Sequence, residues 1–262
     1  MLRNRVLTAL AMAGAVAATL LFAPPWLFGL LLGLVTCCGA YEWASFSGLE
    51  GALSRLLYSG GFALLAGVVF LFPQVQQPLI GLTSLLWVGI FGLVVAYPRG
   101  AFLCKNPLLA GVLGYLILLG AWAALIAIRQ AEGGIGWLFW MFLLTTATDV
   151  GAFFAGRALG RRKLAARLSP AKTWEGVVGG AALAMLLCAG SLWLVLMPPI
   201  WWLLCLPGLL IFFAVVGDLF ESLMKRSSDI KDSGDILPGH GGILDRIDSI
   251  VAVLPVLAWT LI

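Results

Sequence analysis

The chain has 262 residues, of which 62% are hydrophobic and 11% are charged, and its formal net charge is +4. A soluble domain is typically about half apolar and about a quarter charged. This composition, with a mean hydropathy of +1.06, therefore excludes an ordinary soluble domain and predicts an all-α, polytopic integral membrane protein built as a single domain. The positive charge needs no nucleic-acid partner, because basic loops on the inner side of a membrane face anionic lipids.

Apolar runs long enough to cross a bilayer recur along the whole chain. A transmembrane helix needs about 20 apolar residues, and prolines or paired glycines separate the runs. The first run follows a basic start, as in a signal peptide, but Pro24 and Pro25 follow it and apolar sequence resumes, which favours an uncleaved span. The runs predict about nine transmembrane helices, at 6–22, 26–40, 53–72, 79–97, 107–128, 135–156, 174–197, 200–217 and 243–262.

The distribution of Lys and Arg predicts the orientation of these spans. With a cytoplasmic N-terminus, 15 of the 16 basic residues fall in cytoplasmic segments and only Arg129 falls outside. Cytoplasmic loops carry the excess of Lys and Arg in membrane proteins. Nine spans with the N-terminus inside and the C-terminus outside are therefore expected.

The acidic residues gather near the end of the chain. Seven of the twelve lie within 218–248. Asp218 ends the eighth predicted span, and Asp245 and Asp248 share one face in the first turns of the ninth. Carboxylates at that depth are costly unless they are paired or bind metal, and Mg²⁺ often joins one or two carboxylates to substrate phosphates. We therefore expect Mg²⁺ or Mn²⁺ on Asp218 and Asp245, with Asp248 as a supporting ligand. Pairing of Asp245 with Arg246 and helix capping by Asp248 remain open.

The glycine-rich stretch 238–242, PGHGG, precedes the ninth predicted span. Bare backbone N–H groups at a helix N-terminus can approach a phosphate closely. Lys225, Arg226 and Lys231 would add positive charge, and His240 could donate a hydrogen bond or act as an acid or base. The segment is thus predicted to bind phosphate groups beside the metal.

Two polar blocks in the second half of the chain resemble those of one enzyme family. The run SLMKRSSDIKDSGDILPGHGGILDRIDS (222–249) is similar to the diagnostic motif of the phosphatidate cytidylyltransferases, the CDP-diacylglycerol synthases. The matching positions are Ser222, Lys225, Arg226, Lys231, Asp232, Pro238, His240, Gly241, Gly242, Asp245, Arg246 and Asp248. A second block, 148–176, matches at Asp149, Ser169, Pro170, Lys172, Thr173, Glu175 and Gly176. The resemblance covers 145–262, the expected catalytic part, whereas 1–144 matches only in its pattern of spans.

The resemblance implies transfer of CMP from CTP to phosphatidate, giving CDP-diacylglycerol and pyrophosphate, with a divalent cation. A second cation remains open. The resemblance also implies a homodimer in the bacterial inner membrane with the active site facing the cytoplasm. Carried onto this chain, the catalytic residues would be Asp218, Lys225, Arg226, Lys231, Asp232, His240, Asp245, Arg246 and Asp248. The substrate-binding residues would be Asp149, Ser169, Lys172, Thr173, Ser222, Gly241 and Gly242.

Two other functions remain open from the sequence. A CTP-dependent kinase of polyprenol or phytol would transfer a phosphoryl group to a lipid alcohol. An ion-coupled transporter would use intramembrane acids as a relay, but it predicts acids spread through the membrane and repeated halves. Here the acids cluster at one face, and no repeat is evident, which favours an enzyme.

Overall fold

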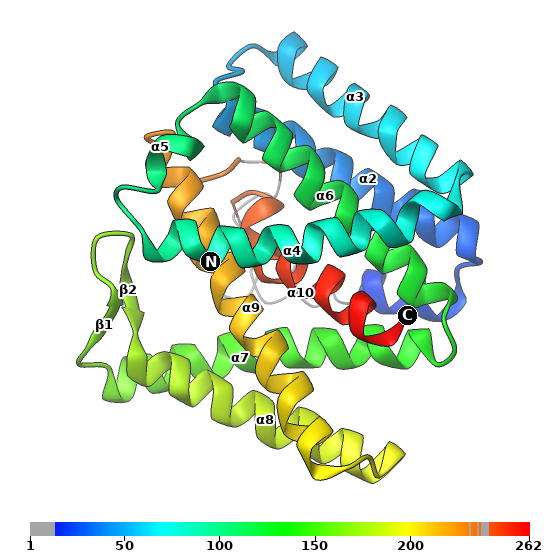
Figure 1. Ribbon diagram of the computed structural model, residues 1–262, viewed down its shortest axis with the longest axis vertical. Coiled ribbons are helices and arrows are strands. Elements are labelled where there is room, and N and C mark those ends of the chain that lie inside the picture. Colours follow the sequence, from blue (N-terminus) through cyan, green and yellow to red (C-terminus); the bar gives the residue numbers. More distant parts are fainter. Residues whose placement is uncertain (1–13, 231, 235, 237–240) are drawn as a thin grey trace.

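The computed structural model describes residues 14–230, 232–234, 236 and 241–262. Helices make up most of this part of the chain, which confirms the all-α class (Figure 1). The long helices are α2 (Pro25–Trp43), α3 (Ala52–Leu71), α4 (Gln76–Val95), α6 (Pro107–Gln130), α7 (Gly134–Leu159), α8 (Trp174–Leu196), α9 (Ile200–Ser227) and α10 (Leu244–Leu261). The shorter elements are the 3-10 turns Ala44–Ser47 and Pro73–Val75, helix α5 (Ala101–Cys104), and the strands β1 (Lys163–Ala165) and β2 (Ser169–Thr173).

Seven helices in the described part are long and apolar enough to cross a membrane, which establishes a multi-pass membrane protein. They are α3, α6, α7, α8 and α9, together with α2 and α4 extended by their flanking 3-10 turns. Of the first predicted span, 6–22, residues 14–22 are helical, and 6–13 lie outside the described residues. Helix α10 carries Asp245, Arg246 and Asp248 in its first five residues, so it is less apolar than the other seven. The count of nine and the sides of the two termini stay predictions.

Helix α9 extends further than the sequence pattern predicted. The apolar run ends at Gly217, but the helix continues to Ser227, so Lys225 and Arg226 lie on its last turns rather than in a loop. The extension is rich in residues that favour helix, including Leu, Glu, Met, Lys and Arg. An ion pair between Glu221 and Lys225, with 3.0 Å between Oε2 and Nζ, has the i,i+4 spacing that stabilises a helix.

A small antiparallel hairpin joins α7 to α8 and was not anticipated. Its strands β1 and β2 pair with Lys163 opposite Thr173, and Figure 1 shows it projecting at one end of the α7–α8 pair. The Glu175 carboxylate at the start of α8 accepts hydrogen bonds from the backbone N–H groups of Arg161 (3.0 Å) and Arg162 (3.2 Å). The polar segment therefore satisfies its backbone groups locally, as a chain without regular helix must.

Helix α10 lies in the middle of the bundle (Figure 1) and packs against α9, α6 and α4. Every residue from Val251 to Ala258 is buried. The crossing of α9 and α10 is close at Gly217, where a Cβ atom would lie only 2.4 Å from the carbonyl oxygen of Asp248. Only glycine permits this approach, and it brings Asp218 beside Asp248.

Candidate active site

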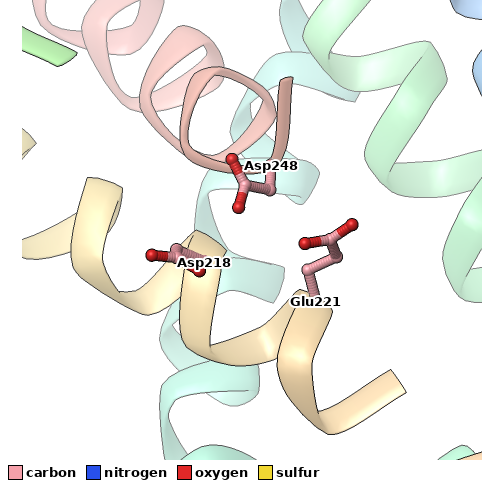
Figure 2. Close-up of side chains that lie close together, drawn as sticks. All are labelled: Asp218, Glu221 and Asp248. Atoms are coloured by element: carbon pink, nitrogen blue, oxygen red, sulfur yellow. The ribbon is translucent and has the colours of Figure 1, made fainter. Parts of the chain in front are cut away.

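Three carboxylates from α9 and α10 meet at this crossing. Asp218 and Glu221 lie three residues apart on α9 and therefore share a face, and Asp248 on α10 approaches them (Figure 2). A carboxylate oxygen from each of the three lies within 4.8 Å of the other two. Like charges this close repel strongly in a partly buried site unless a cation or proton lies between them.

The donor atoms fit a divalent cation. Glu221 is only 7% exposed, and its Oε1 atom has no hydrogen-bond partner among the described residues. Buried polar atoms in native folds nearly always have a partner, and a bound ion can serve as one. Carboxylate oxygens are the hard ligands that Mg²⁺ and similar cations take. The group formed by Asp218, Glu221 and Asp248, here called the carboxylate cluster, could therefore bind a metal ion.

Two lysines form ion pairs with the cluster and its surroundings. Lys172, on β2, pairs with Asp218. Lys225 lies between Glu221 and Asp245 and pairs with both. Both lysines are partly buried, with side-chain exposures of 23% and 18%. Their ammonium groups are thus held where they offset part of the negative charge, and where they could also meet anionic groups of a ligand.

The Lys172–Asp218 pair brings the block 148–176 against the part of α9 that directly precedes the block 222–249, although the two residues lie 46 positions apart in the chain. Asp149, on α7, lies close enough to both for their charges to act on it, and Asp248 interacts electrostatically with all three. Four elements, α7, β2, α9 and α10, therefore supply side chains to one site. The structure thus brings Asp149, Lys172, Asp218 and Asp248 together, and their individual roles stay predictions.

The carboxylate cluster differs from the predicted set of metal ligands. Asp245 was expected to bind metal, but it pairs with Lys225 and accepts a hydrogen bond of 2.8 Å from the backbone N–H of Gly242. Its role as a ligand stays a prediction. Glu221 is the third carboxylate of the cluster instead. The sequence contained a signal for it, because Glu221 follows Asp218 by three residues. The same spacing predicted that Asp245 and Asp248 share one helix face.

The start of α10 is already occupied by carboxylates. The N–H of Gly242 donates to Asp245, and the N–H groups of Ile243 and Leu244 donate to Glu42 at 3.0 and 2.9 Å. We expected this helix start to receive a phosphate. These three donors are used within the protein, so a phosphate would have to meet other groups. The assignment of Gly241 and Gly242 to substrate binding remains a prediction.

The roles of the remaining predicted residues stay predictions. Thr173 is buried and caps α8, since its Oγ1 accepts from the N–H of Gly176 at 3.1 Å. Arg226 is exposed, and its Nε donates to the carbonyl of Leu168 at 3.5 Å. The others are Ser169 at the start of β2 and Ser222 on α9, both half-buried, and the exposed Asp232 and Arg246. Lys231 and His240 lie outside the described residues.

An apolar groove of about 710 Å³ runs along α9 beside the cluster. Its wall on α9 extends from Leu219, the neighbour of Asp218, to Gly208, a rise of about 16 Å along the helix axis. Apolar residues of α4 and α8 form the opposite side, and Arg167 of the hairpin also lines it. The groove thus combines a long apolar wall with a cationic residue at the hairpin.

The chain is similar to known proteins over nearly its whole length. A family model described as the cytidylyltransferase family matches residues 3–262. The phosphatidate cytidylyltransferase of Pseudomonas aeruginosa is 38% identical over 260 residues, which covers 98% of this chain and 96% of that protein. The phosphatidate cytidylyltransferase of Haemophilus influenzae is 37% identical, covering 97% and 96%. That of Bacillus subtilis is 40% identical over 166 residues, covering 61% and 62%.

Proposed function

Because the chain belongs to the cytidylyltransferase family, we propose that it is a phosphatidate cytidylyltransferase, which transfers CMP from CTP to phosphatidate and gives CDP-diacylglycerol and pyrophosphate. The observation that carries the proposal is the meeting of the carboxylate cluster with Lys172 and Lys225 at the α9–α10 crossing. Such a site suits a reaction between two phosphate-bearing substrates. The two relatives that match over 96% of their own length are both named phosphatidate cytidylyltransferase.

In the proposed reaction, a phosphate oxygen of phosphatidate attacks the α-phosphorus of CTP. The new P–O bond forms as the bond from the α-phosphorus to the bridging oxygen of the β-phosphate breaks, and pyrophosphate leaves with that electron pair. A phosphomonoester is largely dianionic at neutral pH, because its second pKa is about 6, so the nucleophile needs no strong base. The work of the protein is to hold two anions in line and to stabilise the charge on the leaving group.

We assign these tasks to the residues of the site. Lys172 and Lys225 would hold phosphate oxygens, because each ammonium group already lies against carboxylates from the reacting centre. Asp218, Glu221 and Asp248 would hold Mg²⁺ or Mn²⁺, and that ion, when bound, neutralises phosphate charge. Asp245 and a second cation remain part of the proposal as further contributors at the same centre.

The groove beside Leu219 supports a lipid as one substrate. Its wall is apolar over a length of about 16 Å, which suits an acyl chain, and Arg167 complements an anionic headgroup. We propose that this end of the bundle faces the cytoplasm, where CTP is available. The support is the basic hairpin, with Arg161, Arg162, Lys163 and Arg167, since cytoplasmic segments carry the excess of such residues.

The test is a reconstitution with the purified protein, phosphatidate, Mg²⁺ and CTP labelled at either the α- or the γ-phosphorus. The proposal predicts label in lipid from α-labelled CTP only. Label in a lipid alcohol from γ-labelled CTP would instead identify a lipid-alcohol kinase. No lipid labelling from either position would contradict both enzymes and favour a transporter. The proposed homodimer is checked on the same sample by light scattering in detergent.

A further inference from the structure

Glu42 is a buried carboxylate that the proposed reaction does not use. It lies in the last turn of α2, far along the sequence from both polar blocks, and it is only 2% exposed. Burying an ionised carboxylate costs several kcal/mol unless hydrogen bonds or opposite charges compensate. The position of such a group in the N-terminal half of the chain therefore requires a structural reason.

The reason lies at the start of α10. Oε1 of Glu42 accepts a hydrogen bond from the N–H of Ile243 at 3.0 Å, and Oε2 accepts one from the N–H of Leu244 at 2.9 Å. The first N–H groups of a helix have no partners within the helix, and a negative charge there interacts favourably with the helix dipole. The N-cap residue of α10, Ile243, offers no side-chain cap. Glu42 supplies this cap from about 200 residues away.

Two glycines allow the carboxylate to approach. A Cβ atom at Gly234 would lie 2.6 Å from Oε1 of Glu42, and one at Gly242 would lie 2.7 Å from Oε2. Real Cβ atoms do not come this close to an oxygen, so both positions must lack a side chain while Glu42 is in place. The structure thus gives Gly242 a role in receiving Glu42 that is independent of any substrate phosphate.

We propose that Glu42 is a positioning residue for the reaction, which fixes the first turn of α10 and thereby the carboxylates of Asp245 and Asp248. Asp245 lies one residue after the N–H of Leu244, and Asp248 lies one further turn along. Asp245 pairs with Lys225, whereas the carboxylate of Asp248 lies within 4.8 Å of those of Asp218 and Glu221, so repulsion opposes the placement of Asp248. The two hydrogen bonds that the buried Glu42 carboxylate accepts are charge-assisted, and they hold the helix start against that repulsion. Helix α2 therefore contributes to the site without touching it.

The experiment uses the full-length protein in detergent. Its kinetic arm rests on the proposed function, its Mn²⁺ arm rests on the proposed metal site, and its hydrogen-exchange arm rests on neither. Glu42→Gln keeps the shape of the side chain but turns one acceptor oxygen into an NH₂ group facing a backbone N–H. We expect hydrogen exchange of amides 243–246 to rise about tenfold, as loss of a charge-assisted hydrogen bond implies. The affinity for Mn²⁺, measured without substrate, should fall about tenfold or more. Losses of this size are typical when a residue that orients metal ligands is changed. With substrates, kcat should fall while KM for CTP changes little.

The matched control is Trp43→Phe, which alters the next residue of α2. Trp43 is also buried, and the change removes its hydrogen bond to the carbonyl of Ala110, which is 2.8 Å long. We expect this variant to lower Tm but to leave Mn²⁺ affinity and the exchange of amides 243–246 as in the parent. If Glu42→Gln lowers Tm and nothing else, Glu42 is a packing residue and the proposal is wrong.

A second variant covers the case in which Glu42→Gln does not insert into the membrane. Glu42→Asp keeps the charge but shortens the side chain by one methylene, so its effects on exchange and Mn²⁺ affinity should lie between those of the parent and those expected for Glu42→Gln. Parent-like values for Glu42→Asp would overturn the proposal. If the parent fails to transfer CMP, the proposed function fails, but the exchange and Mn²⁺ measurements still decide the role of Glu42.

Discussion

The close crossing of α9 and α10 at Gly217 gives a sharp test of how tightly the site is built. Gly217→Ala adds one methyl group beside Asp218, without changing any charge. Its Cβ would lie 2.4 Å from the carbonyl oxygen of Asp248 and 2.9 Å from Cβ of Ala252. Carbon–oxygen contacts are seldom shorter than about 3.3 Å, so the two helices must separate by roughly 1 Å at this point.

The expected effect follows from that displacement. Asp218 lies on one helix and Asp248 on the other, so the separation widens the carboxylate cluster directly. A misplacement of about 1 Å in a catalytic constellation can cost about 100-fold in rate, which corresponds to about 2.7 kcal/mol in the activation free energy. Overpacking of a well-packed contact also lowers the free energy of unfolding, by about 1–3 kcal/mol.

The assay measures kcat/KM for CTP and phosphatidate together with Tm in detergent. The control is Gly190→Ala on α8, where the added Cβ would meet nothing within 4 Å and should leave both quantities nearly unchanged. A Gly217→Ala variant whose kcat/KM stays within threefold of the parent would refute the reasoning, even if its Tm falls, because the cluster would then tolerate the helix shift.

Three further predictions address the metal, a helix cap and the topology. Glu221→Gln should weaken Mn²⁺ binding at least tenfold, whereas the exposed Glu50→Gln should not; equal affinities would remove Glu221 from the ligand set. Thr173→Val should lower the free energy of unfolding by about 1 kcal/mol through loss of the α8 cap, and Thr173→Ser should restore it; equal Tm values would refute the cap. In a variant without native cysteines, a membrane-impermeant thiol reagent should label a cysteine added after Ile262 but not one replacing Asp229 in intact spheroplasts. The reverse pattern would overturn the nine-span orientation.

Local pattern was enough to predict several parts of the site. Asp218 and Asp248 were predicted as site residues because each lies beside an apolar run. Burying an unpaired carboxylate at the depth of a membrane costs free energy, so such a residue usually has a function. The helical spacing of three also connected neighbours on one face. The spacing of three from Asp218 also points to Glu221, provided that both residues lie on a helix. The predicted span ends at Gly217, where the apolar run stops, so the spacing rule was not applied beyond it. Helix α9 continues because the following residues favour helix and pair with one another, which a hydropathy boundary does not detect.

Local sequence was sufficient for the membrane class, most of the helix positions and the family, since these depend on the length of apolar runs and on residues close together in the chain. The tertiary structure alone decided which acids share the cluster, that Lys225 pairs with Asp245, and that Glu42 caps α10. These contacts join helices separated by up to about 200 residues, and their partners are fixed by how closely the helices cross. Gly217, Gly234 and Gly242 set those distances, and a glycine in sequence does not show which distant atom will take the space it leaves.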